Sequence, residues 1–192
     1  KPPAIAWQIG LGTQIFGNTV LGVRIGSVIL SIFLPLSIYA LSRECDLKRR
    51  TAFWSAIVMS FCPIGILSSF AATTDGGFIF FWTLAITSFS RSLRKNEEPQ
   101  YLLIGFLIAF AAFFKWPIYA LWPVFFSFSY FKNFKRIDTK FLQGILISLF
   151  GLLPSIIWNS SHEWSTFRHV GNTLLPRSLT TQGSGTPFFN GN

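Results

Sequence analysis

The chain has 192 residues, of which 51% are hydrophobic, 18% aromatic and only 12% charged. A soluble domain carries about 25% charged residues, and the apolar residues here cluster in runs of roughly 15 to 22, so the composition excludes a soluble domain, a disordered chain and a disulfide scaffold. The net charge of +9 would suit nucleic acid, but the basic residues lie in separate loops between apolar runs, so no nucleic-acid partner is expected.

The apolar runs predict an all-α, polytopic membrane helical bundle. Residues 4–16 are too short and too polar to cross a membrane, so they predict an interfacial helix. The next three runs predict membrane segments over residues 21–41, 52–70 and 78–90, each followed by a polar or basic loop.

Residues 101–131 are too long for one membrane crossing, since a helix of that length measures roughly 46 Å against a core of about 30 Å. Lys115-Trp116-Pro117 interrupts the run, and both flanks are basic. A hairpin of short helices over 101–114 and 118–131 is therefore predicted. A last segment over 141–158 brings the total to about six, and residues 159–192 form a polar tail.

The basic residues predict the orientation. Eleven of the 16 Lys and Arg residues fall in three loops, at residues 43–50, 91–95 and 132–140, which the positive-inside rule assigns to the cytoplasm. Both ends of the chain are then extracytoplasmic. On that side the topology leaves Lys1, Asp75, Lys115, Asn159, His162, Glu163, Arg168 and His169.

Ionisable groups near membrane depth are costly and indicate a substrate or ion path. Asp75 follows Thr73-Thr74 and is interpreted as a functional carboxylate, the alternative being a plain helix N-terminal cap. Lys115, at the hairpin apex, is interpreted as a cation for a phosphate, the alternative being a side chain that snorkels to the headgroups. Arg168 and His169 are candidates for the same role, with an interfacial loop as the alternative.

Other sites have weaker support in the sequence. His162-Glu163 is not followed by the second histidine of the zinc-protease motif. A divalent metal held by His162 and His169 with Asp75 stays one option, and no cofactor is assigned. Cys45 and Cys62 are predicted to be free thiols, because 17 residues of helix separate them by roughly 25 Å.

Four segments in order resemble bacterial protein-mannosyltransferase-like membrane glycosyltransferases, which have the C-type glycosyltransferase fold and are related to lipid A aminoarabinose transferases. The segments are Lys1–Trp7 (KPPAIAW) with Phe16-Gly17 and Gly22–Ile25, Ser69–Trp82 (SFAATTDGGFIFFW), Phe114-Lys115-Trp116, and Pro154–Gly171 (PSIIWNSSHEWSTFRHVG).

The resemblance implies transfer of a sugar from a polyprenyl-phosphate donor to a lipid, glycan or protein acceptor, on the extracytoplasmic face of the cell inner membrane. It implies that Lys1, Lys115, Arg168 and His169 contact the lipid phosphate and that Asp75 is a secondary acid. The family's principal acid, an Asp-Glu pair, would precede Lys1, so residues 1–192 are expected to be a partial transmembrane domain, inactive alone.

Two other functions stay open. A transporter or flippase component would use the same polar residues as a translocation site, although it would be expected to place binding groups near the bilayer midplane and to contain inverted repeats. A noncatalytic membrane scaffold would make no use of Asp75 or Lys115. Membrane lipids are expected partners under every reading.

Overall fold

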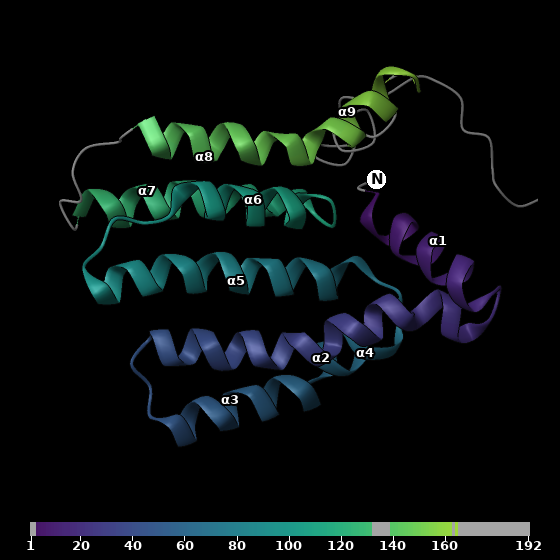
Figure 1. Cartoon of the computed structure of the whole chain (residues 1–192), viewed down its shortest axis with the longest axis horizontal. Coiled ribbons are helices and arrows are strands. Elements are labelled where there is room, and N and C mark those ends of the chain that lie inside the picture. The colour runs from purple at the N-terminus through teal and green to yellow at the C-terminus, as the bar shows by residue number, and fades with distance from the viewer. Residues whose placement is uncertain (1–2, 132–138, 163, 165–192) are drawn as a thin grey trace, which may run out of the picture. The chain divides into compact units, whose positions relative to one another are not determined.

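The computed structural model describes residues 3–131, 139–162 and 164, and in them all regular structure is helical (Figure 1). Lys1, Glu163, Arg168 and His169 lie outside the described residues. Of the described residues, those up to Ser155 form one compact unit, and those from Ile156 onward belong to a second. In the first unit α2, α5, α6 and α8 lie side by side, with α5 between α2 and α6, and α6 between α5 and α8.

The first two helices meet through small residues. α1 (Ala4–Phe16) has the bounds predicted for the interfacial helix, and α2 (Val20–Glu44) contains the segment predicted at 21–41. A Cβ on Gly12 would overlap the Gly22 carbonyl oxygen, so only glycine permits this approach. Gln8 Nε2 also donates to Ser27 Oγ at 3.1 Å. The first turn of α2 is capped by Thr19, which accepts from the Gly22 N–H.

The segment predicted at 52–70 is bent rather than straight. It forms α3 (Arg49–Phe61) and α4 (Pro63–Phe70), with a 61° bend between them. Pro63 disfavours helical backbone at Cys62, and Cys62 Sγ then accepts from the Gly65 N–H as a cap for α4. Cys62 and Cys45 are both free thiols, as predicted.

The central helix is α5 (Thr74–Lys95), which extends the segment predicted at 78–90 by four residues at one end and five at the other. Its buried positions are mostly small or hydroxylated, including Gly76, Gly77, Thr83 and Ser92. Such residues let neighbouring helices approach closely in a membrane. α5 is followed by its C-terminal cap residue Asn96, whose φ of 55° is in the left-handed region.

The predicted break near Lys115 is present. α6 (Tyr101–Ala112) is followed by a 3-10 turn, Trp116–Ala120, and then by α7 (Leu121–Phe131). The hydroxyls of Tyr101 and Ser129 are 2.8 Å apart and join the start of α6 to the end of α7. The two helices therefore run back along each other.

The last described segment consists of α8 (Thr139–Leu149), a 3-10 turn at Phe150–Leu152 and α9 (Leu153–Ser160). α8 packs on α6 through backbone contact, because a Cβ on Gly105 would overlap the Gly144 carbonyl. Trp122 and Tyr119 also bind α8, donating to the Ser148 Oγ at 3.1 Å and to the Ser148 carbonyl at 2.6 Å.

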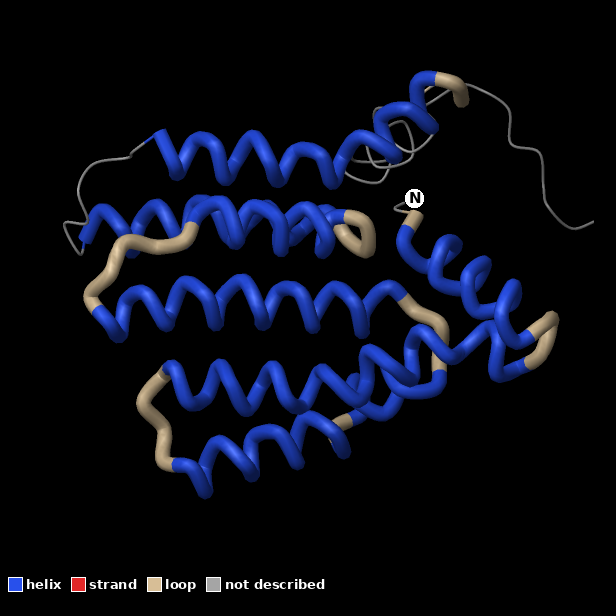
Figure 2. The backbone as a smooth tube through the Cα atoms, viewed as in Figure 1, coloured by secondary structure: helices blue, strands red, loops and turns tan. Residues whose placement is uncertain are grey.

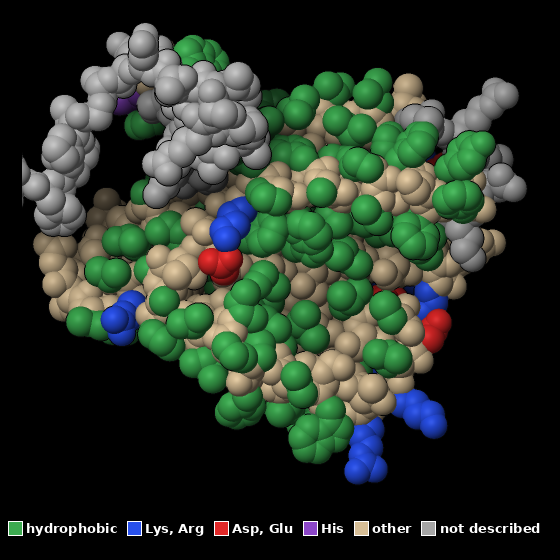
Figure 3. All heavy atoms as spheres, turned by 180° about the vertical axis from the view of Figure 1, so that it is seen from behind, with side chains coloured by type: hydrophobic (Ala, Val, Ile, Leu, Met, Phe, Trp, Pro, Cys, Tyr) green, Lys and Arg blue, Asp and Glu red, His purple; other side chains and the backbone are tan. Residues whose placement is uncertain are grey.

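By length and apolar composition, two described helical stretches can cross a membrane, Val20–Glu44 and Thr139–Ser161, and the bent pair α3 and α4 makes a third if counted as one span. Hydrophobic side chains are spread widely over the face in Figure 3. The chain is thus a helical membrane protein. α5 and the hairpin helices are not among these spans, since α5 carries polar groups and α6 is short, so the full set of about six segments stays a prediction.

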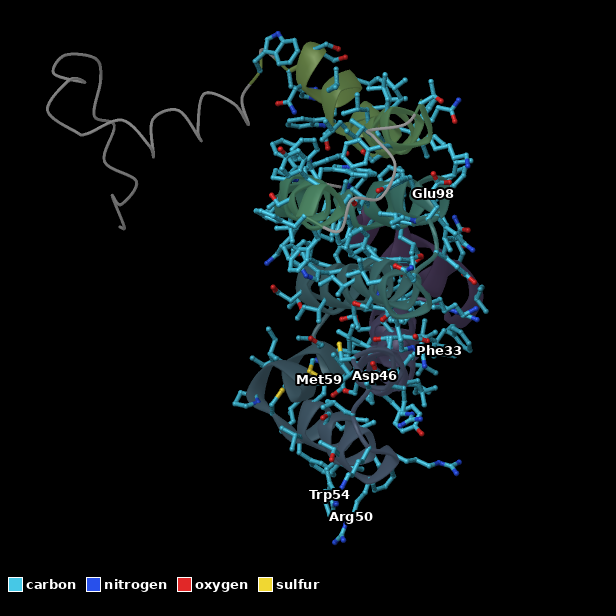
Figure 4. All side chains as sticks on the ribbon, turned by 90° about the vertical axis from the view of Figure 1, so that its left-hand side faces the viewer. Phe33, Asp46, Arg50, Trp54, Met59 and Glu98 are labelled. Atoms are coloured by element: carbon cyan, nitrogen blue, oxygen red, sulfur yellow. The ribbon has the colours of Figure 1, made fainter. Side chains whose placement is uncertain are left out.

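Two of the predicted cytoplasmic loops lie at the same end of the first unit (Figure 2). Arg94 bonds Glu44 at 2.7 Å, which ties the α5 terminus to the α2 terminus. Lys140 bonds Glu98 at 3.0 Å, which ties α8 to the loop after α5. Figure 4 views this end, where Asp46 and Glu98 are labelled. The turns 17–19, 71–73 and 113–115 lie at the other end of the helices.

Candidate functional site

Two of the predicted site residues form an ion pair. Lys115 Nζ lies 2.5 Å from Asp75 Oδ1, although 40 residues separate them in the chain. The side chains are 37% and 40% exposed, so both groups are accessible from outside the protein. Asp75 is contributed by the first turn of α5, and Lys115 by the connection that leaves α6.

Asp75 is positioned by the turn from α4 into α5. Thr73 is the N-terminal cap residue of α5, but its side chain makes no capping hydrogen bond. A Cβ on Gly76 would lie 3.2 Å from Ser68 Cβ, so the α5 start packs closely on α4. The Ser68 hydroxyl is buried there and has no hydrogen-bond partner among the described residues.

Lys115 is positioned by its neighbour Phe114. The Phe114 ring occupies the space where a Cβ on Gly77 would be, with three ring atoms within 2.6 Å of that point. The Lys115 N–H donates to the Ala111 carbonyl at 2.9 Å, after which the backbone is extended, as expected ahead of Trp116-Pro117. The glycine and the ring thus hold the two charged residues within reach of each other.

The start of α1 joins the same end of the bundle. The Ala4 N–H donates to the Phe113 carbonyl at 3.0 Å, and the Trp7 ring meets the Phe113 ring edge-on at 5.5 Å. Ala4, at the start of α1, therefore lies against the hairpin apex. This connection links the first and third segments of the sequence resemblance.

The described geometry bears on the alternatives left open by the sequence. The Asp75 carboxylate bonds the Lys115 ammonium, which differs from a simple helix cap. Lys115 likewise has a carboxylate partner, which differs from free snorkelling. His162, a further polar residue from the prediction, stacks on Trp158 at 4.2 Å, and its Nδ1 lies 2.8 Å from the Trp158 carbonyl.

Sequence reasoning placed Asp75 and Lys115 on one face but missed their direct contact and the packing that produces it. The Gly76-Gly77 doublet was the available signal, since adjacent glycines in a helix mark a close approach. In the part of the chain that the structure describes, no group of three or more His, Cys, Asp or Glu residues could hold a metal ion. His169, the other histidine, lies outside that part.

The pair offers two complementary chemical groups. An ammonium can bind a phosphate oxygen through a charge-assisted hydrogen bond. A carboxylate can accept a hydrogen bond or a proton from a hydroxyl group. Their joint exposure at one end of an apolar bundle suits a substrate that combines a phosphate with hydroxyl groups.

Most of the chain matches known proteins. Residues 1–158 match the family model described as dolichyl-phosphate-mannose-protein mannosyltransferase. The match includes both residues of the ion pair and every described helix up to α9.

Individual relatives are distant. The chain is 27% identical over 164 residues to an undecaprenyl phosphate-alpha-4-amino-4-deoxy-L-arabinose arabinosyl transferase of Pseudomonas aeruginosa strain UCBPP-PA14, covering 82% of this chain and 30% of the relative. It is 24% identical over 163 residues to a similarly named transferase of Pseudomonas fluorescens, with the same coverage. It is also 29% identical over 117 residues to an uncharacterized protein of Aquifex aeolicus, covering 61% of this chain and 23% of the relative.

The chain therefore spans less than a third of the length of these relatives. No solved structure matches it.

Proposed function

Because the chain belongs to the dolichyl-phosphate-mannose-protein mannosyltransferase family, we propose that it contributes to a membrane glycosyltransferase. That enzyme transfers a sugar from a polyprenyl-phosphate donor to a lipid, glycan or protein acceptor. The observation that carries the proposal is the accessible Asp75–Lys115 ion pair, which joins two segments of the family resemblance. The names of the Pseudomonas relatives support a phosphate-linked sugar as donor.

In this proposal Lys115 binds the donor phosphate and stabilises the negative charge that grows on it as the sugar departs. Lys1, Arg168 and His169 are proposed as further phosphate contacts. Asp75 acts as a secondary acid that orients Lys115 and the substrate, and the principal base is supplied from outside residues 1–192. A divalent metal would be an additional way to hold the phosphate.

The reaction is proposed to take place on the extracytoplasmic face of the cell inner membrane. The support is the separation of charges within the first unit, with the Arg94–Glu44 and Lys140–Glu98 pairs at the end of the basic loops and Asp75–Lys115 at the other end. Because basic loops stay in the cytoplasm, the second end faces outward.

The test compares two ion pairs of similar geometry. Lys115→Gln and Asp75→Asn would each be introduced into the protein with its natural flanking sequence, and sugar transfer from a radiolabelled polyprenyl-phosphate donor would be measured in membranes. Lys140→Gln is the matched control, because Lys140 also bonds one carboxylate, Glu98, and is exposed. The expected loss is at least tenfold for the first two variants, and less than twofold for the control.

Two results would contradict the proposal. Unchanged sugar transfer in both Lys115→Gln and Asp75→Asn would indicate a noncatalytic scaffold. Transbilayer movement of the labelled lipid without any transfer, lost in the same variants, would indicate the transporter or flippase function instead.

A further inference from the structure

A second candidate site lies at the opposite end of α5 from Asp75. A groove of about 500 Å³ lies over α5 between α2 and α6, with leucines lining one part and charged residues lining its rim. Leu84 of α5 and Leu103 and Leu107 of α6 line the apolar part. Arg91 and Lys95, four residues apart on α5, line the rim.

The floor of the groove is lined by short side chains, and the hydroxyl groups of Thr87 and Ser92 already donate hydrogen bonds. Thr87 donates to the Thr83 carbonyl at 2.7 Å, and Ser92 donates to the Ser88 carbonyl at 3.3 Å. Both hydroxyls are therefore turned toward the backbone of α5 itself. An occupant of the groove meets short side chains and leucines, which suits a hydrocarbon chain rather than a polar ligand.

The rim carries one cation that is not neutralised. Glu44 is held by Arg94 at 2.7 Å and is only 15% exposed, so its charge is compensated. Lys95 and Glu97 face each other at 4.0 Å, which leaves Lys95 loosely paired. Arg91 is exposed and forms no ion pair with any described carboxylate. The rim thus presents a free guanidinium directly above the apolar floor.

We propose that this groove binds a membrane phospholipid, with one acyl chain along the leucines and the phosphodiester at Arg91. A guanidinium matches phosphate oxygens in a bidentate geometry. Seven residues of helix separate Leu84 from Arg91, about 10 Å, which is the length of a substantial part of an acyl chain. The inference is independent of the glycosyltransferase proposal, because it needs only a helical membrane protein.

The test is a lipid titration of the chain, purified in detergent from bacterial membranes and followed by native mass spectrometry. The probes are phosphatidylglycerol, phosphatidylethanolamine and a diacylglycerol with the same acyl chains. Phosphatidylglycerol is expected to bind the wild-type chain, and the diacylglycerol at least tenfold more weakly because it lacks the phosphate. Phosphatidylethanolamine distinguishes the ligand: equal binding identifies the phosphodiester, and weaker binding identifies net negative charge.

Arg91→Gln is expected to reduce phosphatidylglycerol binding at least tenfold, and Lys48→Gln is the matched control, an exposed cation at the same end that does not line the groove. Ser88→Trp fills the floor while leaving Arg91 in place and is expected to abolish binding, with circular dichroism checking that the helices form. Equal binding of the diacylglycerol would overturn the proposal. So would an unchanged affinity in Arg91→Gln, or an equal loss in Lys48→Gln.

Discussion

At the scale of single residues, the Asp75–Lys115 pair combines modest energetics with a specific geometry. Ion pairs with this degree of exposure contribute roughly 0 to 1 kcal/mol to stability, so the pair is a weak support for the fold. Its effect is instead to hold an ammonium and a carboxylate at fixed positions. Stability and function can therefore be separated by mutation.

Exchanging the two charges tests this separation. The double variant Asp75→Lys, Lys115→Asp restores an ion pair, so its thermal unfolding midpoint is expected to approach that of the wild type, above that of Lys115→Asp alone. Sugar transfer by the protein with its flanking sequence is expected to stay lost, because the cation then sits on α5. Full transfer by the exchanged pair would contradict the individual roles assigned to the two residues.

Gly77 tests how Lys115 is positioned. A methyl group there would overlap the Phe114 ring, so Gly77→Ala is expected to lower the free energy of unfolding by about 1 to 3 kcal/mol. Gly10→Ala is the control, since nothing lies within 4 Å of its Cβ position and alanine favours helix by up to about 1 kcal/mol. Thermal unfolding in detergent measures both. Equal effects of the two changes would show that the ring is free to move away.

At the scale of helices, the sequence predicted the break near Lys115 but not the bend at Cys62-Pro63. The length and polarity of the apolar runs located α1 and most of α2, and the excess length of residues 101–131 together with Pro117 located the hairpin. Pro63 was a visible signal that residues 52–70 bend, but the bend was missed because hydropathy reports polarity and not backbone geometry. The partner of Asp75 could not be predicted from pattern, because it depends on which helices become neighbours.

The α6–α8 contact gives a prediction for helix packing. Gly105→Ala would place a methyl group against the Gly144 carbonyl, which cannot move without shifting α8. Amide hydrogen exchange in Thr139–Leu149 is therefore expected to accelerate at least tenfold, corresponding to about 1.4 kcal/mol of lost protection.

Gly26→Ala is the matched control, since the three atoms nearest to its added methyl all belong to the flexible side chain of Gln8. Its effect on exchange in α8 is expected to be less than twofold. Protection of α8 that is unchanged in Gly105→Ala would contradict the close packing of the two helices.

At the scale of the whole molecule, the two ends of the first unit are predicted to face different compartments. Cys45 is exposed at the end of the basic loops, and Cys62→Ser leaves it as the single thiol. A membrane-impermeant maleimide is expected to label Cys45 in inverted vesicles and not in intact spheroplasts.

A second variant reports on the opposite end. Asn18→Cys, with both natural cysteines replaced by serine, lies in the exposed turn between α1 and α2 and is expected to show the opposite labelling pattern. Labelling of both thiols from one side would contradict the orientation and, with it, the extracytoplasmic placement of Asp75.

The bend at Cys62-Pro63 also bears on how a bilayer would fit around the protein. α3 and α4 contain 13 and 8 residues, and a straight helix of that combined length would reach about 31 Å. With a 61° bend, α4 adds only about 6 Å along the direction of α3, so the reach falls to about 25 Å. If α3 and α4 cross the membrane as one bent span, this reach is shorter than a hydrocarbon core of about 30 Å, and local thinning of the bilayer would relieve the mismatch. Because Asp75 follows closely after Phe70, the last residue of α4, a thinned patch there would bring lipid headgroups toward the depth of the carboxylate.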